Sequence, residues 1–350
     1  MSSNHAIAKK GKSKWTARRV GNLLLDNALI IVMIVAVIYI ACKNKNFLTA
    51  GSIINVISLS AASLPAALGI AGCIVLTGTD LSAGRVVGLT ACVSASLMQT
   101  VGVATKMWPE IGVLPIPVVL LIVIGIGALI GAFNGFFVAK FKLHPFIVTL
   151  ATQLIVYTLL LLYVQMGNNN GMAISSLDAS YSNFVKGSIF SVAGTAIPNY
   201  VWFAVLLTAI MWFVWNKTTF GKNMFALGAN EEAARVSGVN VMATTIIVFA
   251  LAGAMYGITG FIEGARIAAN SANTGLNYEL DAIAACVIGG VSFVGGIGKI
   301  RGIIIGVFLL RLIFVGLNMI SVDQNLQYLI KGVIILFACA IDMRKYLVKK

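Results

Sequence analysis

Long apolar stretches alternate with short polar segments along the chain. Runs of about 20 apolar residues match the roughly 30 Å hydrocarbon thickness of a bilayer. The runs are continuous and do not alternate residue by residue, which favours helices over the strands of a membrane barrel. The candidate spans are residues 27–42, 53–76, 82–101, 116–138, 146–165, 199–215, 242–262, 280–296, 300–320 and 326–343. We therefore expect an all-α polytopic membrane protein with about ten transmembrane helices.

The composition supports a membrane protein. The chain has 350 residues, of which 59% are hydrophobic and 10% charged, and its mean hydropathy is +0.96. A soluble domain needs a largely polar surface, which this composition does not provide. We expect one membrane domain over residues 27–343, between basic tails at 1–26 and 344–350. The first span is interpreted as uncleaved, because no signal-peptidase site follows it.

Basic residues set the orientation. Most of the 25 lysines and arginines lie in segments that share a side with the N-terminus when ten spans alternate across the bilayer. The positive-inside rule then predicts that both termini are cytoplasmic, in a bacterial inner membrane. Polar segments 167–198 and 216–241 fall outside and inside, respectively. The net charge of +14 is scattered over inner loops, which favours contact with anionic lipid over nucleic acid.

Motifs for chemistry are missing from the sequence. The five cysteines are isolated, the two histidines lie far apart, and the Gly-Lys-Ser at 11–13 lacks the earlier glycine of a phosphate-binding loop. We expect no catalytic residue, no metal site and no cofactor bound by this chain.

Glycines recur every four residues in two spans, a spacing that lets helix backbones approach closely in lipid. We expect these residues to pack helices: Gly127, Gly131, Gly135, Gly298, Gly302 and Gly306. The same glycine spacing in the fourth and ninth spans hints that one half of the chain is a duplicate of the other.

A few ionisable residues stand within apolar surroundings. Asp80 and Ser82 could cap the third span while Arg85 reaches the inner interface, or the three could line a pathway or gate, since charges at membrane depth often mark function. A capped break flanked by glycines would also serve as a hinge. Glu263 and Arg266, one turn apart, are expected to form an ion pair. Glu279 and Asp281 could cap the eighth span.

Four stretches together resemble the permease subunits of bacterial ABC importers for monosaccharides. They are TGTDLSAGR (77–85), HPFIVTLAT (144–152), NKTTFGKNMFALGANEEAARVSGVNV (216–241) and YELDAIAACVIGGVSFVGGIG (278–298). The resemblance covers about residues 25–345 and is closest to the galactoside branch, where Thr79-Asp80 replaces the Ile-Asp of relatives for other sugars. It implies a permease fold of the vitamin B12/ribose type.

The third stretch resembles a coupling helix, with which such permeases dock into an ATPase. A short helix of small residues fits a groove in a partner, and glycine can end it with a positive φ. The resemblance assigns this role to Glu231, Glu232, Ala233, Ala234 and Gly238. An ordinary amphipathic loop helix is the alternative interpretation.

The family resemblance implies a passage for a neutral sugar, without chemistry on this chain. Its partners would be a cytoplasmic ATPase carrying ATP and Mg, a periplasmic sugar-binding protein and a second copy, paired across small-residue helix faces. Sugar hydroxyls need amide or aromatic partners, and the candidates are Asn134, Gln153, Asn270, Asn273 and Asn277.

Two other functions remain open from the sequence. A secondary sugar transporter driven by an ion gradient would need paired, buried carboxylates. Almost all acidic residues here lie at the ends of expected spans, which argues against it. A membrane-embedded enzyme would need clustered catalytic groups, and none is evident. An ABC permease for ribose or xylose is a closer alternative.

Overall fold

The computed structural model describes residues 28–192 and 194–347. Its elements are α2 (Ala28–Lys43), α3 (Ala50–Val75), α4 (Ala83–Leu97), α5 (Ile116–Phe141), α6 (Pro145–Gln165), α7 (Ala179–Lys186), β1 (Ser188–Val192), β2 (Thr195–Pro198), α8 (Asn199–Lys217), α9 (Thr219–Ala229), α10 (Glu231–Val236), α11 (Val241–Ile267), α12 (Tyr278–Ile288), α13 (Ile300–Met319) and α14 (Gln324–Leu347). The tail expected at 1–26 lies outside the described residues, and α14 continues past the expected boundary at residue 343.

Seven of the described helices are long and apolar enough to cross a membrane: α3, α5, α6, α8, α11, α13 and α14. They make the chain a multi-pass membrane protein. The apolar parts of α2 and α4 are shorter. Helix α12 has 11 residues and is therefore only about 16 Å long. The expected span at 280–296 is thus not one continuous helix: Gly289 ends α12, and residues 289–299 form a loop.

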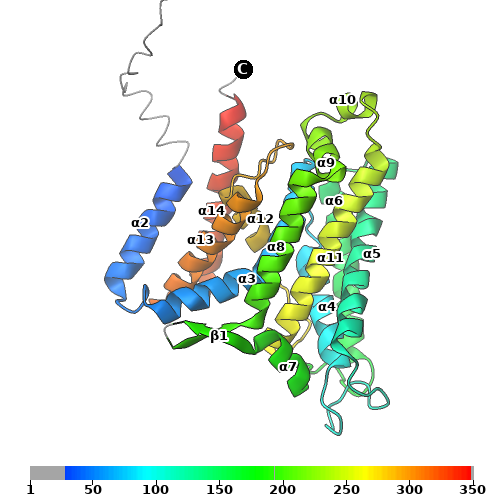
Figure 1. The fold of residues 1–350 in the computed structure, drawn as a ribbon, viewed down its shortest axis with the longest axis vertical. Coiled ribbons are helices and arrows are strands. Elements are labelled where there is room, and N and C mark those ends of the chain that lie inside the picture. The colour runs from blue at the N-terminus through cyan, green and yellow to red at the C-terminus, as the bar shows by residue number, and fades with distance from the viewer. Residues whose placement is uncertain (1–27, 193, 348–350) are drawn as a thin grey trace, which may run out of the picture.

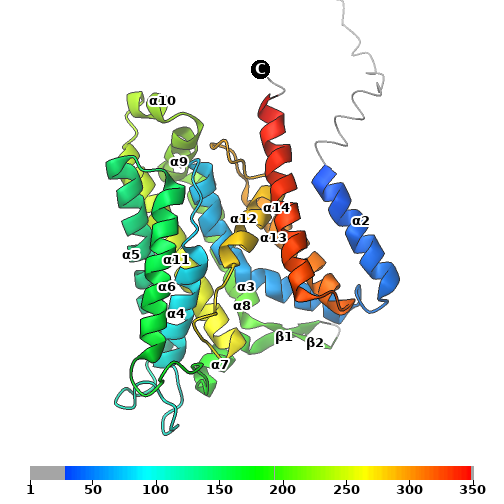
Figure 2. The same ribbon diagram turned by 180° about the vertical axis from the view of Figure 1, so that it is seen from behind.

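Opposite ends of the bundle carry different elements, which we call the α10 end and the α7 end (Figures 1 and 2). Helix α2 begins and α14 finishes toward the α10 end. Helix α3 lies across the bundle near the α7 end and bends upward, with Pro65 inside it. A proline within a helix removes one backbone hydrogen bond and permits such a bend.

The two halves of the chain repeat one arrangement in opposite directions. Helix α3 runs toward the α10 end, and the non-helical segment 76–82 leads from it into the shorter α4, which runs back toward the α7 end. Helix α11 runs toward the α7 end, and segment 268–277 leads from it into the shorter α12, which runs back toward the α10 end. Both segments begin near a non-glycine residue with positive φ, Thr77 at 61° and Ala268 at 60°. Inverted repeats with interrupted helices are a recurring plan of transporters.

Glycines pack the helices of this one chain. Along α5, Gly127, Gly131 and Gly135 lie against the backbone of α11, where an added Cβ would overlap the main chain. In α13, Gly302 and Gly306 lie in the same way against α12. Both faces are therefore buried inside the chain and are not available to a second copy, whose pairing through other small-residue faces stays a prediction.

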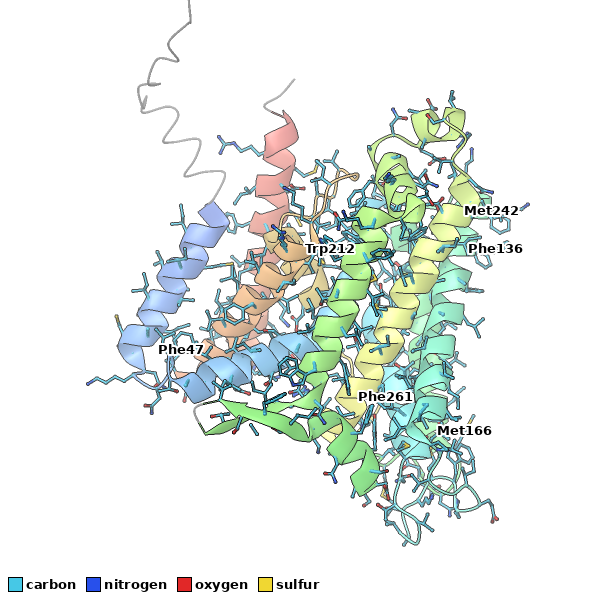
Figure 3. All side chains as sticks on the ribbon, viewed as in Figure 1. Phe47, Phe136, Met166, Trp212, Met242 and Phe261 are labelled. Atoms are coloured by element: carbon cyan, nitrogen blue, oxygen red, sulfur yellow. The ribbon has the colours of Figure 1, made fainter. Side chains whose placement is uncertain are left out.

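Side chains divide between an interior and a lipid-facing exterior (Figure 3). Phe47 and Phe261 are buried, whereas Phe136, Trp212 and Met242 are exposed. An exterior of exposed apolar side chains suits contact with hydrocarbon.

The polar segment 167–198 covers the α7 end with a short helix and a hairpin. Asp178 caps α7 by accepting hydrogen bonds from the N–H and O–H of Ser180, at 2.9 and 2.6 Å, which lowers the pKa of this carboxyl. Strands β1 and β2 pair antiparallel, and Ile174 bridges to Asn270 in the second break. The outer segment is therefore tied to the break in the α11–α12 unit.

Candidate functional site

The two breaks place the first turns of α4 and α12 next to each other. Gly84 and Gly88 of α4 lie against Gly275, Thr274 and Glu279 so closely that a Cβ on either α4 glycine would overlap them. Both helices therefore begin at one junction inside the bundle. A helix N-terminus carries a partial positive charge, which favours the buried carboxyl of Glu279 at this junction.

A chain of buried hydrogen bonds fixes the first break. The Thr152 hydroxyl donates to Asn134 Oδ1 at 2.6 Å, and Asn134 Nδ2 donates to the Ser82 hydroxyl at 3.0 Å. Ser82 donates through its hydroxyl at 2.6 Å and its N–H at 3.0 Å to Asp80 Oδ1. Asp80 therefore accepts a hydrogen bond from the Ser82 N–H, as a helix-capping residue would. The Ser82 side chain, at the N-cap position of α4, accepts no hydrogen bond from the backbone of that helix.

Helix α6 adds a second clamp on the same break. The Thr149 hydroxyl donates to Thr79 O and accepts from Leu81 N–H, both at 3.2 Å. Two of the stretches quoted above, 77–85 and 144–152, therefore form one buried structure. The sequence positions of the two stretches do not predict this contact. The Thr149 hydroxyl and the backbone of Thr79 and Leu81 come together only when the chain is folded.

Arg85 points into the protein. Its guanidinium lies 4.1 Å from the centre of the Tyr157 ring, and Nη1 donates to Ala272 O at 3.2 Å. The expectation that Arg85 reaches the inner interface is therefore wrong. The arginine instead joins α4 to the second break, by a cation–π contact and a charge-assisted hydrogen bond.

A charged network surrounds the start of α12. Asp281 pairs with Lys331 of α14 through Oδ1, and with Arg311 of α13 through Oδ2 at 3.7 Å. Arg311 Nε also donates to the Ser63 hydroxyl at 3.3 Å. Sequence reasoning missed this triad, although two cations standing inside apolar spans signal a buried counter-charge. Asp281 therefore neutralises cations and does not cap α12.

The predicted ion pair between Glu263 and Arg266 is present. Arg266 Nη2 lies 2.6 Å from Glu263 Oε2, and Nε lies 2.8 Å from the same oxygen. Glu263 is buried, so its charge is compensated locally.

Acidic residues that the sequence places at span ends lie inside the fold. Asp80, Glu263 and Glu279 are all buried. Helices α4 and α12 begin within the bundle, so a span end in the sequence is not always a membrane surface in the structure. Buried carboxylates are therefore present, and the position of the acidic residues does not exclude an ion-driven transporter.

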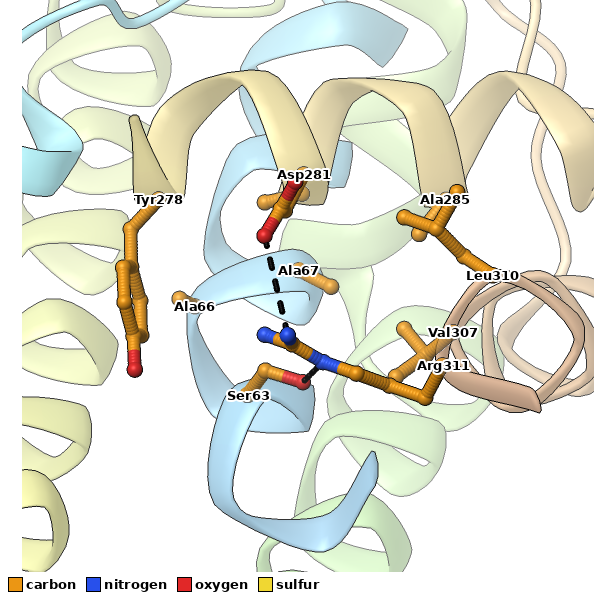
Figure 4. Close-up of a pocket in the computed structure, with 10 residues that line it drawn as sticks. Ser63, Ala66, Ala67, Tyr278, Asp281, Ala285, Val307, Leu310 and Arg311 are labelled. Carbon is orange, nitrogen blue, oxygen red and sulfur yellow. Dashed lines mark hydrogen bonds and ion pairs between the residues drawn. The ribbon is translucent and has the colours of Figure 1, made fainter. Parts of the chain in front are cut away.

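An open pocket lies beside the charged triad, toward the α7 end. Its volume is about 220 Å³. It is lined by Leu276, Asn277, Asp281, Arg311, Phe314, Asn318, Gln324, Gln327, Tyr328 and Lys331. Behind the Asp281–Arg311 pair lies a small void of about 10 Å³ between Ser63, Tyr278 and Leu310 (Figure 4). The ion pair therefore stands between a pocket and closely packed helices.

The remaining predicted pathway residues lie in different surroundings. Of the candidates, only Asn277 lines this pocket. Asn134 is buried in the first break, and Asn270 Nδ2 donates to Gly264 O at 2.8 Å, near the end of α11. Gln153 is half-buried on α6 and Asn273 is exposed. Their roles in transit stay predictions.

The α10 end carries the short helix α10, whose residues are exposed except for one. Asn230 caps α10 by accepting the N–H of Ala233 at 2.9 Å, and Gly238 follows the helix with φ of 85°. Ala234 is buried, whereas Val236 is 90% exposed. Glu231 and Arg235 form a salt bridge at 2.5 Å on the exposed surface. An adjoining groove of about 560 Å³ runs between α10, α11 and the α5–α6 turn.

Residues 216–241 and 278–298, two of the stretches that carry the family resemblance, also meet near the α10 end. Gly296 N–H donates to Val75 O at 2.9 Å, and Gly228 of α9 packs against the same carbonyl. Asp342 of α14 accepts hydrogen bonds from the Ser292 hydroxyl at 2.9 Å and from Phe293 N–H at 3.2 Å. The loop 289–299 therefore links the end of α3 to α9 and α14.

Within residues 28–192 and 194–347, no group of His, Cys, Asp and Glu could hold a metal ion, and the five cysteines are free. The polar groups at the two breaks are suited to hydrogen bonding and charge compensation.

Comparison with known proteins gives the class of this chain. Residues 52–339 match the family described as branched-chain amino acid transport system / permease component, and the chain belongs to it. It is a transport permease subunit of a multi-pass type.

Particular relatives are similar over nearly the whole chain. The galactose/methyl galactoside import permease protein MglC of Escherichia coli K12 is 44% identical over 93% of this chain and 96% of its own length. MglC of Haemophilus influenzae is 42% identical over 94% of this chain and 97% of its own. The ribose import permease protein RbsC of Escherichia coli K12 is 33% identical over 92% and 95%. No solved structure matches.

Proposed function

We propose that this chain is the membrane subunit of an ATP-driven ABC importer that carries galactose or methyl galactoside into a bacterial cell. The observation that carries the proposal is the 44% identity with a galactose/methyl galactoside permease along nearly its full length. Identity with a ribose permease is lower, at 33%, which favours a galactoside over ribose.

Ten crossings account for the arrangement of the helices. Helices α2, α3, α5, α6, α8, α11, α13 and α14 would each cross, and α4 and α12 would each complete a crossing together with the non-helical segment before it. The α10 end would face the cytoplasm with both termini, as the basic residues predict. This plan agrees with a permease of the vitamin B12/ribose type.

The ATPase would dock on α10 and the groove beside it. The exposed Val236 offers an apolar contact at the tip of the loop, and the 560 Å³ groove offers a concave surface next to it. Movement of α10 would reach the first break through α9, since Gly228 of α9 packs on Val75 where α3 ends. ATP and Mg would bind to the ATPase and not to this chain.

A second copy would cover the face between α6 and α14. Helix α14 has only 11% of its most apolar window buried, and the polar pocket with Asp281 and Lys331 opens beside it. Charged side chains at membrane depth need a protein or water environment, which a second copy would supply.

A periplasmic sugar-binding protein would dock on α7 and the β1–β2 hairpin.

Uptake by cells tests the proposed substrate. Bacteria that lack their own galactoside permease, but keep a matched ATPase and binding protein, would receive this chain. We expect uptake of labelled methyl galactoside, with little uptake of ribose. Restoration of leucine or ribose uptake without galactoside uptake would contradict the proposal.

A further inference from the structure

Three charged and several amide side chains converge on the pocket between α12, α13 and α14. Taking the proposed function as its basis, we propose that this pocket is a station that holds the sugar in transit, on the outer side of the Asp281–Arg311 pair. The pocket is lined by the start of α12 and the residues just before it, the second half of α13 and the start of α14, and its volume is about 220 Å³.

Each charged side chain of the pocket is already paired. Asp281 engages Lys331 with one oxygen and Arg311 with the other. Both Asp281 oxygens are thereby engaged, so no carboxylate oxygen is left unpaired for the ammonium group of an amino acid, while the triad keeps a net charge of +1. A neutral ligand rich in hydroxyls fits this arrangement better than an amino acid, because it can share hydrogen bonds with paired charges without separating them.

The amides of the pocket leave hydrogen-bonding capacity for such a ligand. Gln327 Nε2 donates to Asn318 Oδ1 at 2.8 Å and to Val322 O at 2.9 Å. Both donors of this amide group are thereby used, and no described residue donates to its Oε1. An oxygen beside the pocket with a free lone pair is a partner for a sugar hydroxyl, and Asn277 lines the same space.

Aromatic rings complete the lining. The Lys331 ammonium lies 5.2 Å from the centre of the Phe314 ring and 5.5 Å from that of Tyr328. These contacts hold both rings beside the ion pair. A pyranose has an apolar face of C–H groups that packs on an aromatic ring, while its hydroxyls reach the amides and charges around it.

Passage beyond the pocket needs the ion pair to move. The space behind Asp281 and Arg311 measures about 10 Å³, far less than the pocket itself. Arg311 is also held by Ser63 of α3, beside the bend at Pro65. A shift of α3 driven from its α10 end would therefore act on the residue that closes the pocket.

Protection of an engineered cysteine tests the station. Asn318→Cys would be introduced with Cys42→Ser and Cys339→Ser, because the other three native cysteines are buried. The complex with its ATPase would be reacted with a small polar thiol reagent, with and without methyl galactoside. We expect the sugar to slow the labelling severalfold, and leucine to have no effect. A cysteine at the exposed Ser191 of β1 is the matched control and should not be protected.

Variants provide the second measurement. Gln327→Ala should lower galactoside uptake by roughly fivefold, as expected for one hydrogen bond, and remove the protection, whereas exposed Asn325→Ala on the same turn should do neither. If ATP-driven galactoside uptake occurs but neither protection nor the Gln327 effect is found, the station is overturned and the proposed function stands. If the unmodified complex takes up no galactoside, the proposed function fails. Protection by leucine alone would overturn both.

Discussion

Gly84 and Glu279 face each other where the first turns of α4 and α12 meet, although 194 positions lie between these two residues. An alanine at position 84 would push its methyl group into the Glu279 carboxyl and the Gly275 carbonyl. The contact joins two halves of opposite orientation at the point where both helices begin. A permease that moves by shifting one half against the other would do so across this junction.

Gly84→Ala should therefore impair both folding and transport. Overpacking of a buried contact costs about 1–3 kcal/mol, and the Gly275 main chain cannot rotate away as a side chain would. Thermal unfolding of the detergent-solubilised protein and galactoside uptake would measure the two effects. Gly125→Ala on α5, where an added Cβ meets nothing within 4 Å, is the control. Equal stability of the two variants would refute the close approach.

Thr152→Val should weaken the first break. The substitution keeps the shape of the side chain but removes the hydroxyl that donates to Asn134 Oδ1 at 2.6 Å. A buried acceptor left unpaired costs about 1–3 kcal/mol. Thr158→Val on the same helix removes an exposed hydroxyl and should change little. Comparison of the two unfolding midpoints checks this, and a Thr152 variant as stable as the Thr158 variant would argue against the polar chain.

Asp281→Asn should leave Arg311 and Lys331 without their counter-charge. Removal of one partner of a fully buried ion pair costs about 3 kcal/mol or more, and the cost should be smaller here because the three side chains are 12–20% exposed. Addition of Lys331→Met should recover part of this loss, because the coupling of paired residues makes their effects non-additive. Stability and uptake would be measured for both, with exposed Glu110→Gln as the control. Strict additivity of the two substitutions would contradict the observed pairing.

Gly238→Ala should separate ATP hydrolysis from uptake. A φ of 85° is unfavourable for alanine by about 1–2 kcal/mol, so the end of α10 would be distorted at the proposed ATPase contact. Gly102→Ala imposes the same kind of strain at φ of 83° in the loop between α4 and α5. We expect uptake to fall in the first variant and not in the second, while the ATPase stays active. Glu232→Lys should resemble Gly238→Ala. Normal uptake in both α10 variants would remove the coupling role.

The sequence predicts those features that are local. The bounds of α10 follow from its acidic start, its small residues and the glycine after it, all within nine positions. The long helices follow from apolar runs, which reflect the thickness of the bilayer. The pair of Glu263 and Arg266 follows from one turn of spacing.

Features that depend on distant contacts could not be predicted. Apart from Asp281 and Ser292, the run at 280–296 is apolar or glycine, so hydropathy does not show that Gly289 ends α12 halfway. The triad of Asp281, Arg311 and Lys331 unites three helices. Its only trace in the sequence is the presence of two cations in apolar spans, which indicates a counter-charge but not which residue carries it.

Uptake by sealed vesicles tests the central claim most directly: an interrupted, inverted pair of half-chains moves a neutral sugar only when an ATPase acts on the α10 end. Purified protein would be placed in vesicles alone, alone with a proton or sodium gradient, and with its ATPase, binding protein and ATP. The account predicts accumulation of methyl galactoside only in the last case. Accumulation by the protein alone on an ion gradient would contradict it.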